Sequence, residues 1–279
     1  MLTLIQIELY KIFKKWRTYI GFIAIGVLVP IIHTAMVFEG SHTLNFMTRN
    51  IQESFFFVGN LLNGYLVSYF ILTSLAVHIP FLIALVAGDL LAGEATAGTY
   101  RMLITRPISR TQIITSKFLA GIIYTNLLIL WLAVMSLVVG LIIFGTGELL
   151  VISNQTINIF EKSDILWRFL LAYGFASLGM SVVASLAFLF SSLVENSIGP
   201  IVSTMAVIIV FIILSAINID FFQTIKPYLF TNYILSWRLF FDDPVDFTEI
   251  TKATLILAGH IAIFFSLALY LFKRKDILT

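Results

Sequence analysis

Six long apolar runs constrain the fold of this chain more than any motif does. They cover residues 18–38, 61–87, 118–144, 165–190, 198–217 and 253–272. A helix needs about 20 mostly apolar residues to cross the hydrocarbon core of a bilayer, and each run reaches that length. Hydrophobic residues make up 59% of the chain and charged residues 11%, which excludes an ordinary soluble domain. The sequence predicts an all-α, polytopic membrane protein with six transmembrane helices in a single domain, 1–279.

The basic residues predict which side of the membrane each connector faces. Lys and Arg close to the ends of spans are retained on the cytoplasmic side. Most of them lie in the N-terminus, the connector 88–117 and the C-terminal tail: Lys11, Lys14, Lys15, Arg17, Arg101, Arg106, Arg110, Lys117, Lys273, Arg274 and Lys275. The connectors 39–60, 145–164 and 218–251 are rich in acids. We therefore expect a multi-pass protein of the cell membrane with both termini in the cytoplasm. The first run has no small-residue cleavage site, which favours a retained span over a signal peptide.

The flanks of the spans predict short helices at both membrane surfaces. Within residues 1–17, one helical face gathers Leu2, Ile5, Leu9, Ile12, Phe13 and Trp16, with Lys11, Lys14 and Lys15 roughly opposite. This pattern predicts an amphipathic helix on the inner membrane surface, in contact with lipid; a simple basic flank is the alternative. The last external connector, 218–251, mixes acids with aromatic residues, which favours short helices at the outer interface.

The connector 88–117 is the one internal cytosolic segment large enough to bind a partner. Gly98 breaks the continuation of the second span, and Thr99 is placed to cap a short helix that runs to about residue 105. On that helix one apolar face gathers Tyr100, Leu103 and Ile104, whereas Arg101 points elsewhere. Pro107 ends the helix. Ser109 with Gln112 then predicts a capping box that begins the third span.

These residues also carry a family resemblance. The residues that carry this resemblance follow one another in the order Glu94, Gly98-Thr99, Arg106-Pro107, Ser109-Arg110 and Lys117. The connector resembles that of the permease subunits of type-2 ABC exporters. The six spans, the N-terminal amphipathic helix and the long last external connector are similar to that family too. The resemblance implies a coupling helix seated in a groove of a nucleotide-binding subunit. The residues it implies for that coupling are Glu94, Gly98, Thr99, Tyr100, Arg101, Leu103, Ile104, Arg106, Pro107 and Arg110.

The resemblance also implies the partners. The chain has no GxxxxGK[ST] phosphate loop, so we expect it to bind no cofactor, with ATP and Mg²⁺ held by a separate ATPase present in two copies. A second permease, identical or related, would complete the transporter. A bacterial inner membrane fits the resemblance. The basic residues flank spans and form no separate domain, so no nucleic-acid partner is expected, and zero cysteines exclude disulfides and thiolate metal sites.

Other polar residues in or beside the spans have two interpretations each. Glu195, in the short connector 191–200, is either a second ATPase contact or a solvated turn residue. The small polar stripe Ser177, Ser181 and Ser185 lines a transport path or a subunit interface, or packs one subunit internally. Three histidines lie at membrane depth: His33, His78 and His260. They either line a path or bind a metal, or are structural residues bonded to neighbouring helices.

Two other classes of function compete with the transporter. An intramembrane enzyme is disfavoured, because neither HExxH nor a GxSxG-like elbow occurs. A membrane scaffold or sensor that anchors a cytosolic ATPase without transport would use the same connector. Because the spans contain few charges, a hydrophobic or amphipathic cargo is easier to accommodate than a naked ion.

Overall fold

The computed structural model describes residues 1–52, 61–99, 108–152 and 157–274. Helices dominate these residues. Their bounds, with a π-helical segment η1 and 3₁₀ segments η2 and η3, are α1 Leu2–Lys14, α2 Trp16–Gln52, α3 Gly64–Leu75, α4 Ile79–Ala87, α5 Asp89–Thr96, α7 Arg110–Ala133, η1 Val134–Val138, α8 Val139–Phe144, α9 Lys162–Leu193, α10 Ile198–Ala216, α11 Asp220–Ile225, η2 Lys226–Tyr228, α12 Thr231–Ile234, η3 Leu235–Phe241 and α13 Phe247–Arg274.

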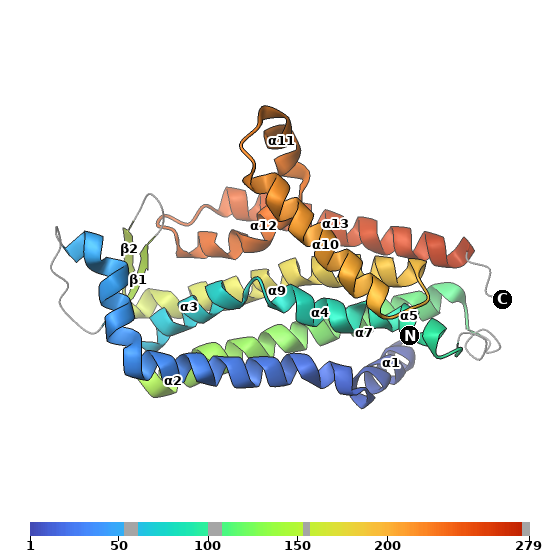
Figure 1. Ribbon diagram of the computed structural model, residues 1–279, viewed down its shortest axis with the longest axis horizontal. Coiled ribbons are helices and arrows are strands. Elements are labelled where there is room, and N and C mark those ends of the chain that lie inside the picture. Colours follow the sequence, from blue (N-terminus) through green and yellow to red (C-terminus); the bar gives the residue numbers. More distant parts are fainter. Residues whose placement is uncertain (53–60, 100–107, 153–156, 275–279) are drawn as a thin grey trace.

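The long helices form an elongated bundle around α9. Figure 1 shows α2, α7, α9 and α13 running along the long axis, with α1, α5 and the end of α13 at one end of the bundle. Of the most apolar stretch of α9, 78% is buried, against 17% for both α10 and α13. A helix that is apolar on all sides and buried lies at the centre of a bundle. The apolar surfaces of the outer helices are therefore left exposed.

The apolar helices are compatible with a multi-pass membrane protein. In the described ranges, five helices are long and apolar enough to cross a membrane, and α3 with α4 forms a sixth candidate if this bent pair is one span. The six-span topology itself stays a prediction. The pair is bent by 55° because Pro80, in the first turn of α4, would clash with the carbonyl of Ala76 in a continuous helix.

Two predicted connectors differ from expectation. The first run was expected to end at Phe38, but α2 continues to Gln52, because residues 39–52 contain no proline and only one glycine to stop the helix. The described residues are all-α as predicted, apart from one short hairpin in the connector 145–164. There β1 (Leu149–Ile152) pairs antiparallel with β2 (Ile157–Phe160), because both segments are rich in β-branched and large apolar residues. The short helices predicted between 218 and 251 are present as α11, η2, α12 and η3.

The third apolar run contains a feature that its sequence did not predict. Its helix changes from α7 into the π segment η1 before continuing as α8. The Ser68 hydroxyl of α3 donates to the Ser136 carbonyl (2.8 Å), and the Ser136 and Tyr173 hydroxyls lie 2.6 Å apart. Groups on α3 and α9 thus bond to the widened turn, where helical carbonyls lose their regular partners.

Candidate functional site

Helix α5, the first part of the connector 88–117, is held by the last turn of α9 and by the turn that follows it. The Ser191 hydroxyl accepts hydrogen bonds from the backbone N–H groups of Leu91 and Ala92, at 3.0 and 2.9 Å. These donors belong to the first turn of a helix, which has no internal partners for them. The Thr96 hydroxyl lies 2.7 Å from the Glu195 carbonyl oxygen. The two short connectors at this end of the bundle therefore form one surface.

The end of α5 explains the Gly98-Thr99 step. Gly98 has φ +65°, a left-handed conformation that glycine adopts without steric cost. The Thr99 N–H donates to the Glu94 carbonyl at 3.0 Å, and the Gly98 N–H donates to the Ala95 carbonyl at 3.0 Å. This pair of bonds is a Schellman motif, which ends a helix. It also brings the Thr99 hydroxyl onto the Glu94 carboxylate.

Glu94 belongs to a largely buried group of four charged side chains and one hydroxyl. We call it the Glu94 cluster, and its members are Glu8, Lys11, Glu94, Thr99 and Lys117. Lys117 Nζ lies 2.7 Å from Glu8 Oε2 and 2.9 Å from Glu94 Oε1. Lys11 Nζ lies 2.9 Å from Glu8 Oε1 and 3.1 Å from Glu94 Oε1. The Lys117 side chain is only 2% exposed. Two cations and two carboxylates thus join α1, α5 and α7.

A second group, the Asp89 cluster, lies one turn of α1 away and consists of Lys15, Arg17 and Asp89. Lys15 Nζ lies 2.8 Å from Asp89 Oδ2, and Arg17 Nη1 lies 2.9 Å from Asp89 Oδ1. The carboxylate is 10% exposed, whereas the two basic side chains are about half exposed. This group fastens the junction of α1 and α2 to the first turn of α5.

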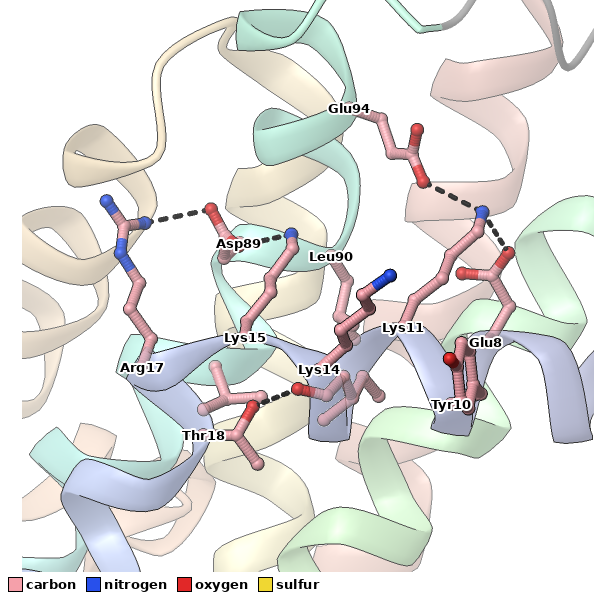
Figure 2. A pocket seen from close by; sticks show the side chains of 12 residues that line it. Glu8, Tyr10, Lys11, Lys14, Lys15, Arg17, Thr18, Asp89, Leu90 and Glu94 are labelled. Carbon is pink, nitrogen blue, oxygen red and sulfur yellow. Dashed lines mark hydrogen bonds and ion pairs between the residues drawn. The ribbon is translucent and has the colours of Figure 1, made fainter.

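Both clusters border a cavity of about 360 Å³ between α1 and α5, drawn in Figure 2. The side chains of Lys11 and Lys15 rise from α1 toward Glu94 and Asp89, respectively (Figure 2). The amphipathic pattern predicts the helix α1 correctly, while its place on the inner membrane surface stays a prediction. Lys11 and Lys15 on its basic face pair with carboxylates of α5.

The surroundings of the Glu94 cluster favour its ionised state. Burial alone would raise the pKa of Glu94, but the charge of Lys117 and hydrogen bonds from Thr99 and Lys117, with the charge of Lys11, lower the pKa to about 2. Burial alone would lower the pKa of Lys11, but its hydrogen bond to Glu8 and the charges of Glu8 and Glu94 raise it overall. Both groups are charged at neutral pH.

Comparison with known proteins places the chain in a family. The family described as "Protein of unknown function (DUF2705)" matches residues 21–278. The chain belongs to this family. "Uncharacterized protein YhcI" of Bacillus subtilis (strain 168) is 28% identical over 197 residues, which are 69% of this DUF2705 chain and 63% of the relative. The match to the family begins after α1 and includes Asp89, Glu94 and Lys117.

The structure of this DUF2705 member places only part of the predicted coupling residues. Glu94, Gly98 and Thr99 come together at the end of α5, and Ser109 forms the predicted capping box with Gln112. Arg110 Nη1 donates to the Lys273 carbonyl of α13 at 2.9 Å. The remaining predicted coupling residues lie outside the described residues: Tyr100, Arg101, Leu103, Ile104, Arg106 and Pro107. Glu8, Lys11, Lys15 and Asp89 were not predicted as part of the site.

The serine stripe makes hydrogen bonds within the DUF2705 chain. Ser177 Oγ lies 2.6 Å from Asn126 Oδ1 of α7, and the hydroxyls of Ser181 and Ser185 donate to carbonyls one turn earlier. Ser185 is fully buried. Both interpretations of the stripe, internal packing and a transport path or subunit interface, stay predictions.

The three membrane histidines lie on different elements. His33, on α2, is 1% exposed, and its ring packs 5.9 Å from that of Phe144. His78 Nδ1 lies 3.2 Å from the Ser74 carbonyl at the break between α3 and α4, and His260 Nδ1 lies 2.8 Å from the Ile256 carbonyl of α13. Within the described ranges, no group of three or more metal-binding side chains is present.

The low pKa of Glu94 makes the stability of this DUF2705 protein depend on acidity. Because the folded pKa is about 2 and the ordinary value is 4.5, the stabilisation is complete above pH 4.5 and is lost as the pH falls toward 2. We expect the unfolding midpoint of the wild type in mild detergent to fall on acidification from pH 4.5. The unfolding midpoint of the Glu94→Gln variant should fall less steeply over the same pH range. Glu249→Gln controls for the loss of one negative charge. If the unfolding midpoints of the wild type and Glu94→Gln changed equally with pH, the assignment of this acid dependence to Glu94 would be contradicted.

Proposed function

We propose that this protein is the membrane permease subunit of an ATP-driven exporter, and that the segment between α5 and α7 binds a separate cytosolic ATPase. The observation that carries the proposal is the Glu94 cluster. Glu94 lies in the last turn of α5, just before that segment, and its carboxylate pairs with Lys117 on α7 and Lys11 on α1. A displacement of the segment would therefore act directly on two other helices of the bundle.

The arrangement of the bundle end supports a docking surface there. Helix α5, the turn after α9 and the end of α13 lie at the same end of the bundle (Figure 1). Thr96 joins α5 to the turn that carries Glu195, and Arg110 joins the start of α7 to α13. We place this end in the cytoplasm because it gathers the basic segments, as the positive-inside rule requires. Glu195 then borders the same surface as a second contact for the ATPase.

Charge pairs of low exposure suit the transmission of motion. Removing one partner leaves an uncompensated buried charge, so the four charged groups of the Glu94 cluster separate only at a large cost in free energy. ATP binding by two ATPase copies would push two such segments, one in each permease half, and shift the bundle between inward and outward openings. The exposed apolar surfaces and the scarcity of charges favour a hydrophobic or amphipathic cargo.

The first test is purification of the chain from its native membrane in mild detergent, followed by mass spectrometry of the proteins that accompany it. We expect a stoichiometric ATPase that contains a Walker motif. The Ile104→Asp variant should lose this ATPase, because a charge enters the predicted apolar face. The matched control is Ile159→Asp on β2, a 56% exposed position at the opposite end of the bundle (Figure 1).

The outcomes separate the proposal from its alternatives. If no Walker-motif ATPase accompanies the wild-type chain, the permease proposal is wrong. If the ATPase is present but equally abundant with both aspartate variants, the predicted coupling segment is wrong. An ATPase that binds through residue 104 while reconstituted vesicles show no ATP-dependent movement of any amphipathic cargo would favour the scaffold.

A further inference from the structure

The α1–α5 cavity has more positive than negative charge on its walls. In the Glu94 cluster, two cations balance two carboxylates. Beside it, Lys15 and Arg17 of the Asp89 cluster pair with the single carboxylate of Asp89, and Lys14 also lines the cavity. The formal excess of positive charge therefore lies at the side of the cavity next to the junction of α1 and α2.

Lys14 has no acidic partner among the described residues. Its Nζ lies over the ring of Tyr10, 5.9 Å from the centroid. Figure 2 shows its ammonium group between those of Lys15 and Lys11, directed to the same side of α1. Lys15 and Arg17 are about half exposed, and a guanidinium has five N–H donors. Three basic side chains thus retain donors for an anion of moderate size.

The start of α2, which follows these cations in the sequence, exposes a surface that suits an apolar chain. The first candidate span begins at Trp16, directly between Lys15 and Arg17. Its outward face exposes Trp16 by 83%, together with Tyr19, Ile20 and Ile23. Tryptophan and tyrosine gather where a membrane meets water, so this part of α2 lies at the level of lipid headgroups.

We propose that Lys14, Lys15 and Arg17 bind the phosphate of an anionic phospholipid, whose acyl chains lie along the exposed face of α2. The shared chemistry is recognition of a phosphate group. A soluble phosphate compound would use the three cations alone, whereas a phospholipid also uses the aromatic and aliphatic wall that α2 exposes. The wall is therefore the reason for choosing the lipid. This inference goes beyond the proposed function and does not depend on an ATPase partner.

Trp16 provides a local measurement of this lipid. The full chain is placed in phosphatidylcholine nanodiscs that contain a small, equal fraction of either dibrominated phosphatidylglycerol or dibrominated phosphatidylcholine. The difference between wild type and Trp16→Phe isolates the fluorescence of Trp16. We expect brominated phosphatidylglycerol to quench Trp16 more strongly, and Lys14→Gln to lower the apparent preference about fivefold, as expected for one basic residue near a membrane surface.

Control variants separate a built site from general attraction. Lys14→Arg keeps the charge and should keep the preference. Lys252→Gln removes an exposed lysine near the start of α13 and should have no effect. Equal quenching by the two lipids, or an equal loss in Lys14→Gln and Lys252→Gln, would overturn the proposal. If soluble glycerol phosphate at millimolar concentration abolished the preference for phosphatidylglycerol, the lipid would be wrong as the ligand. The three cations would then bind a soluble phosphate compound.

Discussion

Lys117→Met should lower the free energy of unfolding by about 3–5 kcal/mol, because it leaves buried carboxylates without their central cation. Lys117 is 2% exposed and lies within 3 Å of both Glu8 and Glu94. Methionine fills a similar volume, so the expected loss arises from charge and not from a cavity. Reversible unfolding of the purified chain in mixed micelles measures the difference.

The matched control for Lys117→Met is Lys252→Met. Lys252 also pairs with a glutamate, Glu249 at 3.2 Å, but both side chains are more than half exposed. An exposed pair contributes about 0–1 kcal/mol. Adding Glu8→Gln to Lys117→Met should recover part of the loss, because it removes one of the stranded carboxylates. Equal effects of the two methionine variants would contradict a buried charge network.

Gly64→Ala should lower the free energy of unfolding by about 1–3 kcal/mol, the usual cost of overfilling a packed site. A Cβ at Gly64 would lie 2.6 Å from the Leu141 Cα and 2.7 Å from the carbonyl carbon and oxygen of Gly140. These are backbone atoms of α8, so no side-chain rotation relieves the clash. Helices α3 and α8 must separate, and thermal unfolding in detergent should show the loss.

Gly174→Ala and Gly259→Ala are controls with the opposite expected sign. Both glycines lie in helices, α9 and α13, and a Cβ there meets no atom within 4 Å. Alanine in an open helical position stabilises a protein by about 0.5–1 kcal/mol relative to glycine. If Gly64→Ala were as stable as these controls, the close approach of α3 and α8 would be wrong.

The sequence predicted the long helices because their outer faces and their packed faces are both apolar. Length and hydropathy therefore locate them without any knowledge of their neighbours. Ser109 with Gln112 marked the start of α7, because this signal acts within one helical turn. The β-hairpin was missed since each strand has four residues, too few to give a distinct period.

The candidate site was harder to predict because its partners are distant in the sequence. Glu94 was singled out through the family resemblance, but Lys11 lies 83 residues before it, and no local pattern relates the two. A usable signal did exist for the missed residue Glu8 and for the pairing of Lys117. Glu8 lies one turn from Ile5 and Ile12 on the apolar side of α1, and Lys117 lies one turn from Ile114 and Ala120 on α7. Opposite charges at apolar positions indicate a buried pair.

The most direct test of the central claim uses the absence of cysteine from the chain. A single cysteine at Ile104 or at Ile159 carries a photoreactive maleimide in inside-out vesicles of the native membrane, and mass spectrometry identifies the adducts after illumination. We predict that the Ile104→Cys chain forms a covalent adduct with a Walker-motif ATPase, and that the Ile159→Cys chain does not. The absence of such an adduct at residue 104, with labelling efficiency equal at both positions, would contradict the account.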